Sequence, residues 1–400
     1  MNKVNFYVSA IYTSPDGSMG GNTKILLEII NELSDKYNFV ILTTEPETFK
    51  KNIHDLTKVS IVQIPYPFTK FSFGSHIKEC TYIWNFYQQY FSNNTINDRD
   101  YFYSCSDFGP DVVPVYLLKS KYKFRWIASL YLFIPNPIEN IVRRYGFPPI
   151  KYLVYYLYQL VMIRLIFSRF DYCFITNDVD LKRFPIKKQK YVLPVYGGVN
   201  TELTSNTPET QTKIYDAVFC SRLHPQKGII KLLTIWREVL DTVPQAKLAI
   251  IGNGEKAFES SLKSRATSLG LDKHISWLGY VNGKEKFHIY GASRLFIHPT
   301  VYDNNGMVAA EALCSGLPVV MFDLPALKNV YKEGCLKIEP YNLDKFSGAV
   351  VDLLTNDKRL GLLKPQKDTV AKLKNKWAWS TRAKLVDKFL QTLDSEKGKD

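Results

Sequence analysis

The chain has 400 residues, which is too many for one ordinary hydrophobic core and predicts about two domains. Hydrophobic residues make up 46% and charged residues 22%, a balance that is typical of a globular protein and excludes an intrinsically disordered one. The six cysteines form no Cys-x-x-Cys pair, and none lies at metal-ligand spacing from a histidine. The sequence therefore predicts neither a zinc site nor a disulfide framework.

The formal net charge of +14 is unevenly distributed. Residues 119–190 contain fourteen Lys or Arg against four acids, which gives this stretch a net charge of +10. Such a stretch favours an anionic partner: nucleic acid, a phosphorylated substrate or an acidic membrane surface. No recognisable nucleic-acid-binding module is present, so nucleic acid is not the partner we expect.

The N-terminal residues do not form a basic region followed by a long apolar core, and we therefore expect a cytoplasmic protein without a signal peptide. Within the basic stretch, residues 150–170 are rich in Tyr and Leu, but their longest run without charge, 152–163, spans only twelve residues. That is short of the roughly 20 needed to cross a bilayer. The pattern fits either an ordinary buried helix or an interfacial helix at an anionic membrane.

In chain order, the first half alternates short apolar strands with helical patterns. Strands are predicted at residues 4–12, 39–44, 101–105, 125–131 and 172–176. After the first strand, Asn22 is the expected N-cap of a helix. The apolar face of that helix comprises Ile25, Leu26, Ile29, Ile30 and Leu33.

The second half repeats the alternation. Strands are predicted at residues 217–222, 247–252, 294–300 and 318–322, and helices at 228–240, 256–270 and 306–316. Near-continuous apolar strands alternating with helices indicate parallel sheets covered on both faces. We therefore expect a chain of the α/β fold class with two Rossmann-like domains, which join within residues 191–212.

Ligands of such sheets bind beyond the carboxyl ends of the strands, so the loops there are the candidate sites. Gly20 and Gly21 precede the first helix, where free amides hold anions and glycine allows close approach. After the first strand of the second half, Arg222 and Lys227 bracket a turn, and such cations suit a diphosphate and the charge that grows on it as it leaves.

Two further loops follow later strands. Gly252 and Gly254 form a tight turn that is compatible with a nearby nucleotide. Asp303 lies in a loop with two asparagines and Gly306, and Glu311 lies on the second turn of the small apolar helix that follows. Glu311 could accept hydrogen bonds from a ribose diol, and Asp303 could hold a sugar hydroxyl.

These segments, in this order, resemble glycosyltransferase family 4, the retaining enzymes of the GT-B fold. The resemblance is carried by "GSMGGNTKILLEIINELS", "VYGGVN", "SRLHPQKGI", "IIGNGE", "ISWLGYV" and "YDNNGMVAAEALCSGLPVV". It implies two Rossmann-like domains whose parallel sheets face a central cleft. We expect an acceptor-side domain at 1–198, a nucleotide-sugar domain at 199–376 and a C-terminal helix, 377–400, that returns to the first domain.

The resemblance also implies roles for particular residues. Arg222 and Lys227 would contact the donor diphosphate, Glu311 the nucleotide ribose, and Gly20 and Gly21 the phosphates or the acceptor. The backbone that would meet the donor comprises Asn305, Gly306, Met307 and Val308.

At two positions the chain departs from the family pattern. The family has Glu, seven residues, then Glu, whereas the first acid here is Asp303, for which we expect an altered reach toward the donor. The family often places a His near the anomeric carbon, and Tyr131 or Leu130 occupies that place here. We take Tyr131 as a candidate catalytic residue beside Asp303 and Glu311, although a wall of the acceptor pocket fits Tyr131 equally well.

Other functions remain open at this stage. Asp178 and Asp180 follow a strand and resemble the metal-holding acid pair of GT-A enzymes. A sugar-nucleotide epimerase, a phosphorylase or a non-catalytic nucleotide-sugar-binding protein would share the fold. We expect a retaining glycosyltransferase that needs no cofactor or metal and moves a sugar from a nucleoside-diphosphate sugar to a glycan or lipid-linked glycan. Peripheral contact with an anionic membrane would be made through residues 119–190.

Overall fold

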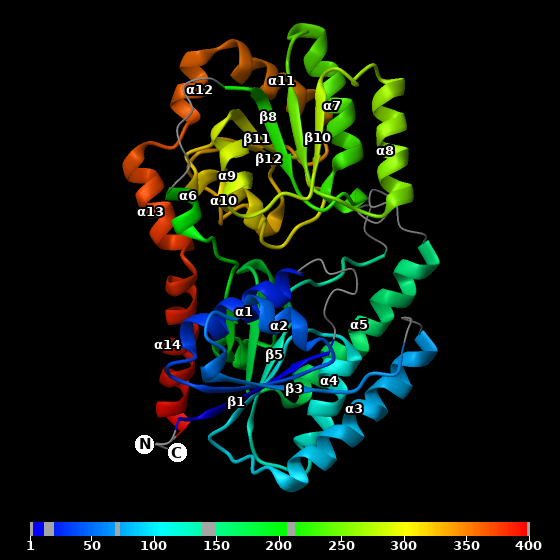
Figure 1. Cartoon of the computed structure of the whole chain (residues 1–400), viewed down its shortest axis with the longest axis vertical. Coiled ribbons are helices and arrows are strands. Elements are labelled where there is room, and N and C mark those ends of the chain that lie inside the picture. The colour runs from blue at the N-terminus through cyan, green and yellow to red at the C-terminus, as the bar shows by residue number, and fades with distance from the viewer. Residues whose placement is uncertain (1–2, 12–19, 69–72, 138–148, 206–212, 398–400) are drawn as a thin grey trace. The chain divides into compact units, whose positions relative to one another are not determined.

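The computed structural model describes residues 3–11, 20–68, 73–137, 149–205 and 213–397. The chain divides into two compact units. Unit 1 comprises residues 1–139, 148–197 and 379–400, and unit 2 comprises 140–147 and 198–378. The predicted domain boundaries lie after residues 198 and 376. In the structure the chain passes from unit 1 to unit 2 after residue 197 and returns to unit 1 after residue 378. Each unit is an α/β structure with a parallel sheet between layers of helices (Figure 1).

In unit 1 the described residues form a sheet of seven parallel strands in the order β3-β2-β1-β4-β5-β6-β7. Their bounds are β1 Asn5–Ala10, β2 Asn38–Thr43, β3 Val59–Gln63, β4 Tyr101–Ser104, β5 Arg125–Ser129, β6 Tyr172–Ile175 and β7 Val192–Pro194. Apart from the partly buried β3, the strands are largely buried because helices cover both sides of the sheet, as the alternating pattern predicts.

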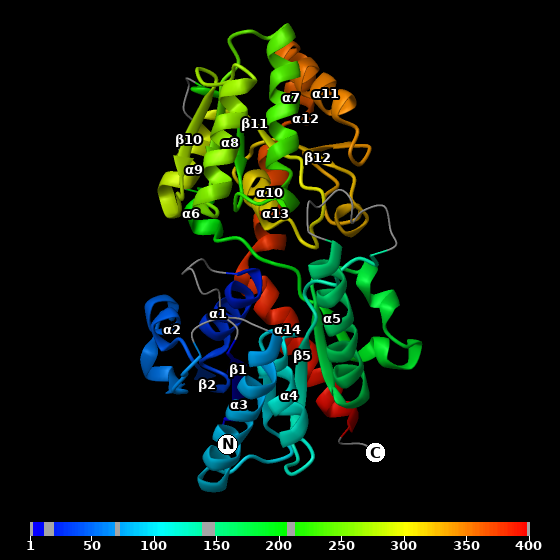
Figure 2. The same ribbon diagram turned by 90° about the vertical axis from the view of Figure 1, so that its right-hand side faces the viewer.

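The helices of unit 1 are α1 Gly21–Leu33, α2 Pro46–Asn52, α3 Phe73–Asn93, α4 Gly109–Leu118, α5 Pro149–Arg169 and α14 Trp379–Lys397. Neighbouring helices α3, α4 and α5 pack on one another, and α14 packs on α1 (Figure 2). The C-terminal helix is fixed to this unit by two acids: Asp387 accepts from Tyr37, and Asp394 accepts from Tyr172 at 2.7 Å.

Unit 2 contains, in its described part, a parallel sheet of six strands in the order β10-β9-β8-β11-β12-β13. The strands are β8 Tyr215–Cys220, β9 Leu248–Ile251, β10 Ile275–Gly279, β11 Ser293–His298, β12 Val319–Phe322 and β13 Cys335–Ile338. The helices are α6 Thr201–Ser205, α7 Ile229–Thr242, α8 Lys256–Ser268, α9 Gly283–Gly291, α10 Met307–Cys314, α11 Leu343–Thr355, α12 Asp357–Leu363 and α13 Lys367–Trp377. Helix α7 packs on α11, and α10 packs on α13.

The expected α/β class with two Rossmann-like units is confirmed, whereas the predicted start of the first helix is wrong. Helix α1 begins at Gly21 with Gly20 as its N-cap, and no side chain caps it. Asn22, the predicted cap, is therefore inside the helix. The apolar face was predicted correctly, because all five of its residues are buried. The loop before Gly20, residues 12–19, lies outside the described residues.

The strand order decides where a ligand can bind. In unit 2 the order reverses at β8 and β11, which are neighbours in the sheet although about 70 residues separate them in the chain. The connections leave these two strands in opposite directions, and ligands of such sheets bind beyond the carboxyl ends of the strands at this point. These are the loops that contain Arg222, Lys227 and Asp303.

Candidate functional site

The loop after β8, residues 221–228, lies directly against the loop after β9. Leu223 donates its amide to the carbonyl oxygen of Asn253 at 2.8 Å and forms an isolated parallel bridge with Gly254. Gly252 has a φ of 140°, and a Cβ atom there would lie 1.8 Å from the carbonyl oxygen of Ser221. Only glycine allows this approach. The predicted glycines Gly252 and Gly254 therefore support the cationic loop.

One glutamine joins this loop to the loop after β11. Gln226 lies in a short 3₁₀ helix, Pro225–Lys227. Its carbonyl oxygen accepts the amide of Val301 at 3.0 Å and the hydroxyl of Thr300 at 3.1 Å, and its carboxamide donates to the carbonyl oxygen of Tyr302 at 3.0 Å. The loops after the two switch-point strands are therefore held together by these hydrogen bonds.

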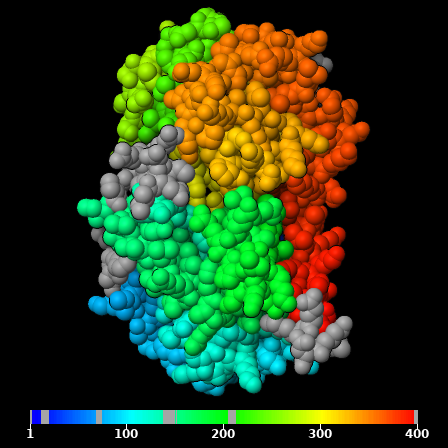
Figure 3. Space-filling model, turned by 180° about the vertical axis from the view of Figure 1, so that it is seen from behind, coloured from blue at the N-terminus to red at the C-terminus, as the bar shows by residue number. Residues whose placement is uncertain are grey.

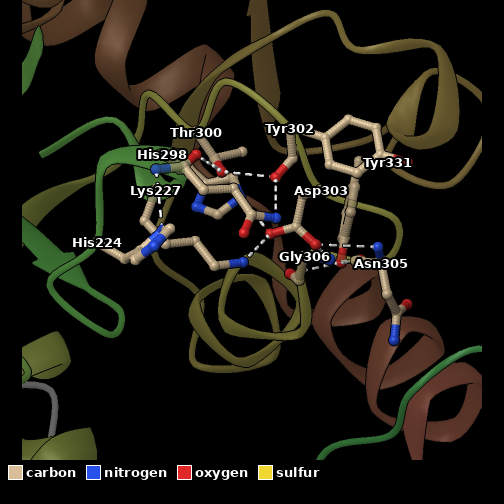
Figure 4. A network of polar contacts seen from close by, with 10 residues as sticks. His224, Lys227, His298, Thr300, Tyr302, Asp303, Asn305, Gly306 and Tyr331 are labelled. Carbon is tan, nitrogen blue, oxygen red and sulfur yellow. Dashed lines mark hydrogen bonds and ion pairs between the residues drawn. The ribbon is translucent and has the colours of Figure 1, made fainter. Parts of the chain in front are cut away.

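Asp303 lies at the centre of the polar network in Figure 4. Its Oδ1 accepts the amides of Asn305 at 3.2 Å and Gly306 at 3.0 Å, and its Oδ2 accepts the Lys227 ammonium at 2.7 Å. Burial alone would raise the pKa of this carboxyl, but Lys227 and the other donors hold it well below its usual range. Both oxygens of Asp303 are thus engaged inside the protein.

Two histidines of these loops add no charge to the site at neutral pH. His298, at the end of β11, is buried, and its Nε2 lies 3.7 Å from Oδ2 of Asp303. Burial lowers the pKa of His298 to about 4. Burial, together with Arg222 and Lys227, also lowers the pKa of His224 to about 4. The positive charge of the site therefore comes from Arg222 and Lys227.

Helix α10 begins at the edge of this network with unused backbone donors. Its N-cap, Gly306, has a φ of 61°. Tyr331 donates to the carbonyl oxygens of Asn305 and Gly306, each at 2.8 Å, and so fixes the turn. Among the described residues the amides of Met307 and Val308 have no backbone or side-chain acceptor. Two free amides at the positive end of a helix dipole can bind an anion.

Glu311 lies one turn further along α10 and is only half satisfied. Its Oε1 accepts the Lys286 ammonium, which comes from α9, at 2.8 Å. Its Oε2 is buried and has no hydrogen-bond partner within the described part of the chain. Burial opposes the charge of Lys286, but the Glu311 carboxylate outweighs it and raises the pKa of Lys286. Glu311 therefore has one acceptor oxygen that no described residue uses.

Arg222 differs from Lys227 in being exposed and unpaired. The structure gives its guanidinium no hydrogen bond or ion pair with any described residue. Lys227 is half-buried and bound to Asp303. The loop after β8 thus presents one fixed cation and one free cation, and an exposed Arg can form the bidentate contact that a phosphate accepts.

The other predicted site residues belong to unit 1. Gly20 and Gly21 form the uncapped start of α1. The hydroxyl of Tyr131 lies 2.6 Å from that of Tyr103, and burial holds the pKa of Tyr131 far above its ordinary value, so this tyrosine is neutral. Leu130, the alternative at this place, is buried.

Asp178 and Asp180 do not point into a shared site. Asp178 accepts the hydroxyl of Tyr196. Asp180 accepts from Asn177 at 2.7 Å and from Arg183 at 2.9 Å. No group of three or more His, Cys, Asp or Glu that could hold a metal ion occurs in the described residues.

Sequence reasoning missed Gln226, Lys286, His298 and Tyr331. Gln226 and His298 lie within or beside the quoted motifs, and their positions after switch-point strands were a usable signal. Lys286 and Tyr331 had no such signal, because each reaches the site from an element 20 or more residues away from its partner.

The part of the chain that matches a known family lies within unit 2. Residues 201–369 match the family model described as glycosyl transferases group 1. The matched part includes the unit 2 site residues from Arg222 to Tyr331.

Two curated relatives are similar over part of the chain. O-antigen chain mannosyltransferase B from Escherichia coli is 26% identical over 142 residues, which is 35% of this chain and 37% of that protein. Phosphatidyl-myo-inositol mannosyltransferase from Mycobacterium leprae is 30% identical over 167 residues, which is 40% of this chain and 43% of that protein. These matches thus cover less than half the length of either relative.

The fold is similar over the whole chain. Sucrose-phosphate synthase from Thermosynechococcus elongatus superposes with a TM-score of 0.77 at 15% identity, covering 98% of this chain and 100% of that one. The protein therefore has the GT-B fold of two Rossmann-like units.

Proposed function

We propose that the protein is a retaining glycosyltransferase of the family 4 type, which moves a hexose from a UDP- or GDP-linked sugar to a glycan or lipid-linked glycan. The observation that carries this proposal is the unpartnered, buried Oε2 of Glu311, which lies on the same helix as the free amides of Met307 and Val308. A carboxylate oxygen can accept a hydrogen bond from a ribose hydroxyl, and helix amides and an Arg guanidinium can donate hydrogen bonds to a diphosphate.

The chemistry follows from where charge develops. The bond between the anomeric carbon and the diphosphate oxygen breaks, a bond to the acceptor oxygen forms, and the acceptor proton passes to the leaving diphosphate. Negative charge therefore grows on the diphosphate, and fixed donors that face it lower the barrier. Arg222, Lys227 and the amides of Met307 and Val308 are donors of this kind, so we propose that no divalent metal is required.

Asp303 acts differently in this proposal. Because its oxygens are occupied by Lys227 and two amides, we assign it the task of positioning Lys227 and the start of α10. Tyr131 is proposed to contribute a neutral hydroxyl on the acceptor side. The acceptor class is supported by the names of the two relatives, one acting on an O-antigen chain and the other on a phosphatidyl lipid.

The direct test measures melting temperature with UDP, GDP, ADP and their common sugars, each in EDTA and in Mg²⁺. A ligand that binds only the native state raises the melting temperature by mass action. We expect one nucleotide to stabilise the wild type in EDTA and to raise the melting temperature less with Arg222→Ala and with Glu311→Gln.

Glu311→Gln also leaves Lys286 without its counter-ion, and this could lower stability by itself. The double variant Glu311→Gln, Lys286→Met removes that unpaired charge and is expected to recover stability but not nucleotide binding. Stabilisation that requires Mg²⁺ and survives both Arg222→Ala and Glu311→Gln would contradict the proposal.

Product analysis separates the related functions. Transfer to an added acceptor with the donor's anomeric configuration kept, measured by NMR, supports a retaining transferase. Interconversion of the donor sugar alone would indicate an epimerase, and phosphate-dependent release of a sugar phosphate a phosphorylase. Nucleotide-sugar binding without turnover would indicate a binding protein.

A further inference from the structure

Helix α5 carries a continuous apolar stripe on its outer side. The stripe comprises Ile150, Leu153, Val154, Leu157, Leu160 and Val161, all exposed. Ile150 is 79% exposed, and Leu157 and Val161 are each more than half exposed. Residues at spacings of three and four lie on one face of a helix, so the six side chains form one band about 16 Å long. A soluble surface seldom leaves such a band uncovered.

The opposite face of α5 is part of the core of unit 1. Met162 and Ile166 are buried in the same cluster as Trp126. Gln159 accepts the amide of Ile134 at 2.7 Å and donates to Asp107 at 2.7 Å. The helix is therefore firmly held from inside, and the stripe is a permanent feature of the outer surface.

A further exposed apolar residue and most of a group of cations lie on the segment that packs against the C-terminal end of α5. Ile186, in the 3₁₀ helix Ile186–Tyr191, is 86% exposed. This segment is fixed to α5, because the rings of Phe184 and Phe167 lie 4.8 Å apart and Lys188 donates to the carbonyl oxygen of Phe167. The exposed cations nearby are Arg164, Lys182, Arg183, Lys187 and Lys190. Figure 3 shows α5 and the segment after it side by side on one face.

We infer that this α5 surface, defined by the stripe, Ile186 and the five cations, docks onto an anionic lipid membrane. Apolar side chains flanked by Lys and Arg are the composition of interfacial helices, in which the apolar face enters the headgroup region and the cations meet acidic lipids. No helix within the described residues could span a bilayer. The cations favour this occupant over an uncharged protein groove.

Membrane docking also has a consequence for the acceptor side of the site. This consequence, unlike the docking itself, rests on the proposed function. From its inner face α5 holds residues 132–135: Gln159 donates to the carbonyl oxygen of Leu132 at 2.6 Å, and Tyr152 donates to that of Pro135. These residues directly follow Tyr131. The helix that meets the membrane thus also fixes the segment next to the proposed acceptor hydroxyl, where a lipid-linked acceptor would arrive.

The test is co-sedimentation of the full chain with vesicles, without donor, so that its result does not depend on transferase activity. Phosphatidylglycerol-rich vesicles are compared with pure phosphatidylcholine vesicles. We expect strong binding only to the anionic vesicles, weakening steeply from about 0.1 M to about 1 M salt as the Debye length falls from about 10 Å to about 3 Å. Equal binding to both vesicle types would overturn the electrostatic part of the inference.

The matched variants separate the apolar and charged contributions. Leu157→Glu with Val161→Glu should lower the vesicle partition coefficient at least tenfold, whereas Ile214→Glu with Leu362→Glu, equally charged but in unit 2, should leave it unchanged. Arg164→Gln with Lys182→Gln and Lys187→Gln should lower it on anionic vesicles, whereas Lys256→Gln with Lys263→Gln and Lys273→Gln should not. All these positions are exposed, so folding should persist, which circular dichroism checks.

Three results would overturn the inference. One is a wild type that stays in the supernatant with anionic vesicles. Another is equal loss of binding in the α5 double variant and its unit 2 control. The third is a chain that binds no vesicles but self-associates with rising concentration, as measured by sedimentation velocity, and loses this self-association with Leu157→Glu and Val161→Glu. The stripe would then be the contact surface for a second copy of the chain.

Discussion

Two acids on one loop and helix, Asp303 and Glu311, are eight residues apart and have different environments. Asp303 has both oxygens engaged by Lys227 and by backbone amides. Glu311 has one oxygen on Lys286 and one that is buried and has no hydrogen-bond partner among the described residues. Each acid neutralises one lysine, yet only Glu311 retains an unsatisfied acceptor. Burying such an acceptor costs free energy unless a ligand completes it.

The difference teaches that a carboxylate's role depends on what its second oxygen contacts. Asp303 stabilises the site, and Glu311 is available to a ligand. Four experiments test this distinction.

Asp303→Ala should lower the free energy of unfolding by about 3 kcal/mol, because it leaves the Lys227 ammonium and two amides without their acceptor. Asp303→Asn should cost less, since its amide oxygen can still accept from Asn305 and Gly306. The measurement is urea unfolding of the full chain. If Asp303→Ala lowers the free energy of unfolding no more than a substitution at an exposed position does, Asp303 does not stabilise the site and is available to a ligand.

Stability should also fall as pH is lowered from about 7 to 4. The pKa of His298 is about 4 in the folded protein against an ordinary 6.5, so in this window the unfolded chain binds the additional proton. His298 contributes up to about 3 kcal/mol to this loss. The lowered pKa of Asp303 acts further down, where its stabilisation is lost as pH falls below its ordinary 3.8.

The check on the histidine is urea unfolding at several pH values for the wild type and His298→Gln. The variant should show a shallower loss between pH 7 and 4. An unchanged slope would mean that other groups carry the pH dependence, among them His224, whose pKa is also about 4.

Glu311→Gln should weaken nucleotide binding about tenfold or more, equivalent to about 1.4 kcal/mol or more, because a neutral amide is a poorer acceptor for a ribose hydroxyl. Calorimetric titration of the stabilising nucleotide measures this. Asp303→Asn is the matched comparison and should change affinity less than threefold or so. Equal losses of affinity in the two variants would remove the distinction between the acids.

Arg222→Ala should have the smallest effect, a loss of nucleotide affinity of about threefold to tenfold with unfolding stability unchanged within about 0.5 kcal/mol. The guanidinium is exposed and contacts no described residue, so folding does not depend on it. Arg222→Lys should restore part of the affinity at low salt. A destabilised Arg222→Ala would show that the residue supports the loop rather than the ligand.

Much of the fold could be predicted because local patterns specify it. The alternation of apolar strands with amphipathic helices predicted two parallel sheets, and the strands over 39–44 and 172–176 appear as β2 and β6. The short strands β3, β7, β10 and β13 were not predicted. Among them, β3, β10 and β13 are only partly buried, so they lack the continuous apolar run by which the predicted strands were found.

The site could be predicted only in part. Glycine and acid positions identified the loops that matter, since residue type is a local property. What each group does could not be predicted, because hydrogen bonding is set by residues distant in sequence. Lys286 reaches Glu311 from another helix, and Tyr331 fixes the turn at Gly306.

The sequence by itself determined the α/β class, the loops that carry chemistry and the uneven charge, because periodicity, residue type and charge are local properties of the chain. Only the tertiary structure decided which acid is satisfied, which cation is free and which side of residues 150–169 is uncovered. A parallel sheet brings the ends of distant strands together, and packing then fixes which polar atoms find partners and which are left for a ligand.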